Sequence, residues 1–262
     1  TLTAADDQPL PPEFALQNPA DYIKVLRESV PAAVKASGVD PADIVGIGVD
    51  ATSATVFFTD EDGVPLCEKP GFENNVHAYV KLWKHHGAQD QATRLVKVAE
   101  ARREWWLGRY GGVLSSELLL PKVLEVFEMA PEVYEEAAVV CNLLDWLTWR
   151  LTGTLTQSAG DSGYKRMLQD GTYPSHEYLE AVKPGFGTVF EDKMSAPVLP
   201  LGAKVGGLTK EMAELTGLPE GIAVASGNID AHVVVAGANA VRPGQLTAIL
   251  GTSSCYVLNG EE

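Results

Sequence analysis

Apolar residues fall into short continuous runs near the two ends of this chain and into a helical spacing between them. The runs at 44–49 and 222–225 predict buried strands, and 55–58, 246–250 and 255–258 predict three more. The spacing between them predicts helices at 77–86, 90–107, 117–129, 131–138, 143–151, 174–183 and 209–216. Strands at both ends and helices in the middle predict an α/β domain that carries a helical insertion.

Two more helices are indicated by local signals. Asn18 and Pro19 are typical of a helix start, and Gly38 is expected to end that helix. Residues 231–238 are small and apolar, which predicts a tightly packed helix. The apolar stripe of the first helix consists of Tyr22, Val25, Leu26 and Val30.

A carboxylate follows the apolar run at 222–225. Gly227 permits a close approach of the backbone, and Asp230 stands where the next helix begins. Ligands of open α/β sheets bind at the carboxyl ends of strands, so Asp230 could be a general base that accepts a hydroxyl proton during phosphoryl transfer. The position also suits a helix N-cap, and spacing alone gives the two interpretations equal weight.

Two further polar turns follow strands. Gly251, Thr252 and Ser253 offer amides and hydroxyls that could cradle a phosphate, although an ordinary hairpin turn fits the pattern better. No lysine follows that would make this turn a Walker A loop. Residues 50–53 are likewise typical of an ordinary polar turn.

Three kinds of side chain outside these turns could touch a ligand. Trp83 fits either a core position or a platform on which a sugar stacks, and the core is favoured. His85 and His86 are adjacent and cannot both face one metal ion on a helix, so a solvated helix end is expected. Lys165 could hold a sugar hydroxyl or a phosphate, but a lysine in such a loop is more often a solvated surface charge.

Composition narrows the class of partner. The chain has 262 residues, with 35 acidic and 20 basic side chains and a formal charge of −15, so we expect neither nucleic acid nor anionic membranes as partners. A phosphate ligand stays compatible, because backbone amides bind anions locally. The three cysteines lie far apart, which argues against disulfides and zinc and for a reducing, cytoplasmic location. No apolar run reaches the roughly 18 residues of a membrane span.

Taken in chain order, these segments resemble the FGGY carbohydrate kinases, and among them the kinases that act on ribulose. The resemblance extends from about Tyr22 to the last strand. Its most specific parts are the Lys-Leu-Trp-Lys-His-His run at 81–86 and the Gly-Asn-Ile-Asp-Ala-His run at 227–232. Its other parts are residues 46–53, 110–117, 145–153, 163–165 and 251–253.

The resemblance implies two actin-like ATPase domains with a ribonuclease H-like sheet, which hold sugar and ATP in the cleft between them. Residues 1–241 would form the N-terminal, sugar-binding domain without its first strands, and residues 242–262 the start of the C-terminal, nucleotide-binding domain. The implied reaction is the ATP-dependent phosphorylation of L-ribulose at its 5-hydroxyl in L-arabinose catabolism. Mg²⁺ would arrive on the nucleotide, with no metal ligand supplied by the chain.

The resemblance also assigns roles to individual residues. It implies that Asp230 binds the sugar and deprotonates its 5-hydroxyl. Ser53, Trp83 and Lys165 would line the sugar pocket. The phosphates of ATP would be approached by Gly251, Thr252 and Ser253.

Some features depart from the family. Ala51 stands where members often carry Phe, residues 1–40 lack the Asp-x-Gly-Thr hairpin with which members open, and members continue well past Cys255. We therefore expect a fragment of a kinase that has no turnover of its own. Two alternatives stay open at this point: a non-catalytic sugar-binding or regulatory module, and a kinase for another ketopentose such as D-ribulose or xylulose. A homodimer is equally left open.

Overall fold

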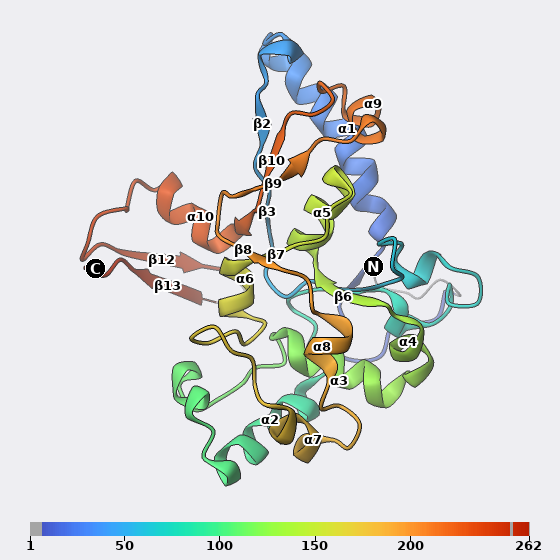
Figure 1. The fold of residues 1–262 in the computed structure, drawn as a ribbon, viewed down its shortest axis with the longest axis vertical. Helices are drawn as coiled ribbons and strands as arrows, with labels where there is room; N and C mark the ends of the chain where they lie inside the picture. The colour runs from blue at the N-terminus through green and yellow to red at the C-terminus, as the bar shows by residue number, and fades with distance from the viewer. Residues whose placement is uncertain (1–6, 252–253, 262) are drawn as a thin grey trace.

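The computed structural model describes residues 7–251 and 254–261, and it has the predicted α/β class (Figure 1). The helices are α1 Pro19–Ser37, α2 Gln89–Arg102, α3 Leu119–Met129, α4 Pro131–Glu136, α5 Leu143–Thr152, α6 Ala159–Tyr164, α7 His176–Val182, α8 Val189–Lys193, α9 Lys210–Thr216 and α10 Asp230–Gly237. The strands are β1 Leu16–Gln17, β2 Gly46–Ile47, β3 Asp50–Ala51, β4 Val56–Thr59, β5 Val80–Lys81, β6 Val139–Asn142, β7 Gln157–Ser158, β8 Val198–Leu199, β9 Lys204–Gly207, β10 Ala223–Ala225, β11 Asn228–Ile229, β12 Leu246–Leu250 and β13 Ser254–Leu258.

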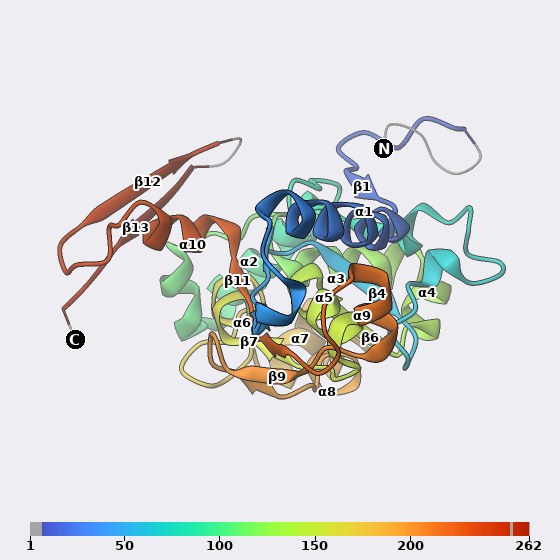
Figure 2. The same cartoon turned by 90° about the horizontal axis from the view of Figure 1, so that it is seen from above.

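The strands form several small sheets. An antiparallel sheet has the order β1-β5-β4-β6, and a second sheet has the order β2-β10-β9, in which β2 and β10 run parallel. Two further pairs of strands run parallel: β3 pairs with β11, and β7 pairs with β8. The hairpin of β12 and β13 extends away from the rest of the molecule in both views (Figures 1 and 2).

Strand β4 separates two parts of the core, because successive side chains point to opposite faces of a strand. Val56 and Phe58 are buried on the face covered by α2, α3, α7 and α8, within the largest apolar cluster. Phe57 points the other way and stacks on Trp146 of α5, with ring centroids 4.6 Å apart. The helical insertion thus covers one face of this sheet, and α5 covers the other.

The first helix begins and ends where the sequence predicts. The Asn18 side chain accepts a hydrogen bond from the amide of Ala20 (3.0 Å), and Gly38 adopts φ 70°, the left-handed conformation that favours glycine at a helix end. Leu26 and Val30 pack against the third apolar cluster. Val25, which was assigned to the same stripe, is 56% exposed, so that part of the prediction is wrong.

Three other predictions need correction, and one strand was not predicted. Residues 77–86 form a short 3-10 turn, β5 and further turns instead of a helix, and residues 139–142, which were assigned to no element, form β6. The run at 44–49 yields only β2, at the edge of its sheet, with Val45 83% exposed. Helix α10 has no buried residue, so it is not tightly packed among the residues that the structure describes. In the segment 77–86, the pairing of β5 with β1 and β4 overrides the local helical pattern.

Candidate active site

Two short parallel strands bring separate parts of the chain to one edge. Strands β3 and β11 pair so that Ile229 lies beside Ala51. The chain leaves β3 through Thr52 and Ser53, and it leaves β11 into Asp230. Because the carboxyl ends of parallel strands meet at the same edge, this register places Ser53 and Asp230 on one cavity, as expected for an open α/β sheet.

A glycine is required for this close approach. A Cβ atom at Gly227 would lie 2.3 Å from the carbonyl oxygen of Val49 and 2.4 Å from a methyl carbon of Leu144. Both distances are far shorter than van der Waals contact, so any larger residue would push β11 away from β3. The sequence prediction that Gly227 permits a close backbone approach is confirmed.

The cavity has a volume of about 270 Å³ and is open to solvent. It gathers residues from the segments after β3 and β5, from the end of α6, from α10 and from the β12–β13 hairpin, which are distant in sequence. Its walls are formed by Thr52, Ser53, Trp83, Glu117, Tyr164, Lys165, Ile229, Asp230, Ala231, Ile249, Gly251, Ser254 and Cys255. Five of the seven predicted site residues therefore share one cavity, whereas Thr252 and Ser253 lie outside the described residues.

Asp230 is the first residue of α10 rather than its N-cap. The preceding Ile229 occupies the cap position, without a side-chain cap bond. The Asp230 carboxylate accepts a hydrogen bond from the amide of its neighbour Ala231 (2.7 Å) and lies on the cavity wall. The N-cap interpretation of Asp230 is thus wrong, and the carboxylate faces the space where a ligand would sit.

Lys165 is held in an ion pair at the cavity. Its Nζ lies 3.6 Å from Oε2 of Glu117, and each side chain is only 14% exposed. His86 approaches the other oxygen of Glu117 at 3.8 Å. Lys165 is therefore not the solvated surface charge that is usual for a lysine in a loop. Sequence reasoning did not single out Glu117 or Tyr164 for the site, although Glu117 closes the 110–117 run and Tyr164 directly precedes Lys165.

Lys122 joins two walls of the cavity from behind. Its buried Nζ donates to the carbonyl oxygens of Ala54 and Leu82, each at 2.7 Å, and of Trp83 at 3.2 Å. Ala54 follows Ser53 and has φ 52°, a conformation that costs energy for alanine. Burial lowers the pKa of Lys122 well below its usual value. Lys122 thus fixes the backbone on both sides of the sugar pocket predicted from Ser53 and Trp83.

The histidine next to this segment is buried rather than solvated. Lys81 and His85 each lie 2.9 Å from Oε2 of Glu125 on α3, and all three side chains are at most 3% exposed. Burial lowers the pKa of His85 to about 4. Burial alone would raise the pKa of Glu125, but the hydrogen bond from His85 and the charge of Lys81 hold it at about 2. The cluster anchors β5 to α3 and leads directly into Trp83.

The hairpin side of the cavity carries the thiol of Cys255 and the ring of Tyr164. Tyr164 stacks edge-on against His232 of α10, with centroids 4.9 Å apart, and its hydroxyl lies 3.9 Å from Sγ of Cys255. Cys67, Cys141 and Cys255 are all free.

Within residues 7–251 and 254–261, no group of three or more His, Cys, Asp or Glu side chains could hold a metal ion. In the same residues, no helix has the length and apolar character needed to cross a membrane.

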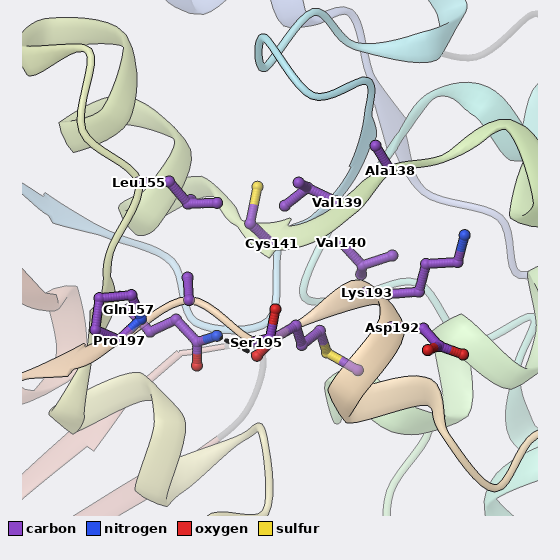
Figure 3. Close-up of a pocket in the computed structure, with 12 residues that line it drawn as sticks. Ala138, Val139, Val140, Cys141, Leu155, Gln157, Asp192, Lys193, Ser195 and Pro197 are labelled. Carbon is purple, nitrogen blue, oxygen red and sulfur yellow. Dashed lines mark hydrogen bonds between the residues drawn. The ribbon is translucent and has the colours of Figure 1, made fainter.

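A second cavity lies between β6 and the segment after α8 (Figure 3). It measures about 260 Å³ and shares no lining residue with the first. Its polar side chains bond to the protein itself: Lys193 donates to the carbonyl of Ala137 and Gln157 to that of Met194, each at 2.5 Å. Because this cavity contains none of the predicted site residues, the first cavity is the better candidate for an active site.

Comparisons with known proteins identify the family of the chain. Residues 3–237 match the family described as the FGGY family of carbohydrate kinases, N-terminal domain. The chain is 50% identical over 251 residues to a ribulokinase of Mycolicibacterium smegmatis, and the match covers 96% of this chain and 45% of that protein. It is 45% identical over 255 residues to a ribulokinase of Geobacillus thermodenitrificans, with 97% and 45% covered. The chain thus spans about half the length of these curated relatives.

Solved structures share the fold at lower identity. A xylulose kinase from Rhodospirillum rubrum superposes with a TM-score of 0.71 at 22% identity, over 97% of this chain and 47% of that one. Glycerol kinase of Plasmodium falciparum, solved with ADP, gives 0.65 at 14% identity, over 95% and 47%. These likenesses establish the actin-like fold of the first kinase domain.

Proposed function

The chain belongs to the FGGY family of carbohydrate kinases, and from this membership we propose that the intact protein transfers the γ-phosphoryl group of ATP to the 5-hydroxyl of L-ribulose. The observation that carries the proposal is the single cavity shared by Asp230, Ser53, Trp83 and Lys165. The choice of L-ribulose is supported by the relatives named ribulokinase, which are 39–50% identical to this chain.

Asp230 is the proposed base. As the 5-hydroxyl attacks the γ-phosphorus, its proton passes to the Asp230 carboxylate, while the bond from the γ-phosphorus to the β,γ-bridging oxygen breaks and ADP leaves with that electron pair. The phosphoryl group passes directly between substrates, without a covalent enzyme intermediate. The start of α10 supports this role, because the bond from the amide of Ala231 holds the carboxylate at the cavity wall.

The remaining sugar contacts divide by chemistry. Lys165 donates hydrogen bonds to sugar oxygens, and the ion pair with Glu117 keeps its Nζ at the wall. Trp83 offers an apolar ring face against the carbon side of the sugar. Ser53 contributes a hydroxyl that is held by a buried partner.

The nucleotide side is proposed at the β12–β13 turn. Gly251 lines the cavity, and we propose that it approaches the phosphates of ATP together with Thr252 and Ser253. Mg²⁺, carried on these phosphates, would neutralise their charge. We place the boundary between the sugar-binding and nucleotide-binding domains at 241/242; the family match ends at residue 237.

The experiment is a substrate panel with the intact protein. L-ribulose, D-ribulose, L-xylulose and D-xylulose are each incubated with ATP and Mg²⁺. ADP release measures the rate of the reaction, and phosphorus NMR of the product identifies the carbon that carries the phosphate. The proposal predicts the highest kcat/KM for L-ribulose and a phosphate ester on carbon 5. A higher kcat/KM for another ketopentose would overturn the substrate assignment, and sugar binding without ADP release would favour a non-catalytic binding module.

A further inference from the structure

A buried carboxylate lies directly behind Ser53. Asp161 of α6 is 1% exposed and does not line the cavity, whereas Ser53, which is 8% exposed, does. The Ser53 hydroxyl donates a hydrogen bond to Oδ1 of Asp161, although the two residues are 108 positions apart in the chain. Ser53 therefore has one side toward the ligand and one side toward Asp161.

This bond determines what Ser53 can offer to a ligand. A serine hydroxyl has one hydrogen and two lone pairs. With its hydrogen directed at Asp161, the oxygen can present only lone pairs to the cavity. Ser53 in this state accepts a hydrogen bond from a sugar hydroxyl, but it cannot donate one to a carbonyl or ether oxygen.

The surroundings of Asp161 keep it available as the acceptor. The charged groups that face it are Asp145 of α5, Lys122 of α3, and Arg166 and Lys165 at the end of its own helix. Arg166 is engaged by Asp145, with 2.6 Å between Nη2 and Oδ2. Among the described residues, Oδ2 of Asp161 has no hydrogen-bond partner. Asp161 thus has no direct ion pair in this part of the chain, and Ser53 is the hydrogen-bond donor to its carboxylate.

We propose that Asp161 is a positioning residue that fixes the polarity of the Ser53 hydroxyl, so that this point of the sugar subsite selects a hydroxyl donor on the ligand. The inference rests on the proposed function for the identity of the ligand as a polyhydroxy ketose. Asp161 itself does not touch the sugar; it acts through Ser53.

Acid should reverse this polarity. Burial, followed by the charge of Asp145, raises the pKa of Asp161 to about 6, against the lowering effects of Ser53, Arg166 and Lys165. The carboxylate is therefore mostly ionised at pH 7.5 and mostly protonated at pH 5.5. Once protonated, Asp161 can donate to Ser53, and the serine hydrogen turns toward the cavity. The sugar hydroxyl then meets a donor instead of an acceptor.

The test is sugar affinity measured by titration calorimetry of the intact protein with L-ribulose, without ATP, so that the readout does not depend on turnover. Asp161→Ala should weaken binding about fivefold, the value of one hydrogen bond of about 1 kcal/mol. In a Ser53→Ala background, Asp161→Ala should have no further effect. Asp161→Asn retains an acceptor oxygen and should bind nearly as well as the wild type at pH 7.5.

The pH profile provides an independent readout. Wild-type Kd should rise about two- to threefold between pH 7.5 and pH 5.5, because part of Asp161 is still ionised at pH 5.5, whereas Kd of Asp161→Asn and of Ser53→Ala should not follow that rise. If Asp161→Ala does not fold, this profile alone decides the matter. Equal effects of Asp161→Ala with and without Ser53, or the same pH response in Asp161→Asn as in the wild type, would overturn the inference while leaving the kinase assignment intact. Failure of the wild type to bind L-ribulose or any of the other three ketopentoses would overturn both.

Discussion

The buried pair of Lys81 and Glu125 provides a strong test of how the site is held. Their charged atoms lie 2.9 Å apart, and the side chains are 0% and 3% exposed. Replacing Glu125 with Gln leaves the ammonium of Lys81 in an apolar environment without a counter-charge. Removing one partner of such a pair typically costs about 3–5 kcal/mol, because a buried charge is left uncompensated.

The matched control removes both charges. In Lys81→Met/Glu125→Gln, no charge is left unpaired, and the Gln oxygen can still accept from His85. Replacing a buried ion pair with neutral groups is often close to neutral in stability, so we expect the double variant to lose clearly less than Glu125→Gln alone. The loss of about 3–5 kcal/mol expected for Glu125→Gln alone would be a large part of the roughly 5–15 kcal/mol by which a typical domain is stable.

The assay is urea unfolding of the 262-residue chain, followed by far-UV circular dichroism. The reasoning predicts a strong drop in the midpoint for Glu125→Gln and a partial recovery in the double variant, with an unchanged slope. If the destabilisation of the double variant equals the sum of the losses in Glu125→Gln alone and Lys81→Met alone, the reasoning is refuted, because the pair would then contribute no coupling energy.

Three further predictions concern pH, the sugar platform and the extent of the chain. The folded-state pKa of His85 lies near 4, below its unfolded value of 6.5, so the unfolded chain takes up this proton first. Stability should therefore fall by about 3 kcal/mol from pH 6.5 to pH 4, and His85→Asn should remove that part of the pH dependence in urea titrations. Trp83→Ala should weaken L-ribulose binding by tenfold or more in calorimetry, at about 1.4 kcal/mol or more, whereas Trp83→Phe keeps a ring face and should lose less. The 262-residue chain alone should release no ADP from ATP and L-ribulose, since it spans 45% of its curated relatives; steady turnover by the purified chain would contradict this.

The sequence predicted those parts of the fold that depend on interactions between residues close together in the chain. Asn18 and Gly38 fix the two ends of α1 through a side-chain cap and a left-handed turn, and both effects act within a few residues. Gly227 before Asp230 correctly marked a place where two strands approach closely, because a glycine ahead of a strand-end carboxylate is a specific pattern.

Distant contacts explain what the sequence could not reveal. The polar run from Lys81 to His86 resembles a solvated helix end, yet Glu125 lies 40 positions away and draws two of its side chains into the core. Nothing near Asp161 indicates that it meets Ser53, since their contact depends on how α6 packs against the edge formed by β3 and β11. Helix α10 looks like a core segment by composition but is half-exposed beside the hairpin.

The most direct test of the central claim is the rate of phosphoryl transfer in Asp230→Asn of the intact protein. Single-turnover experiments with saturating L-ribulose and ATP measure the chemical step, and calorimetry with L-ribulose measures binding separately. If Asp230 is the base, the rate should fall by about 10²–10⁴-fold while sugar affinity changes little. A chemical step in Asp230→Asn as fast as in the wild type would contradict the account.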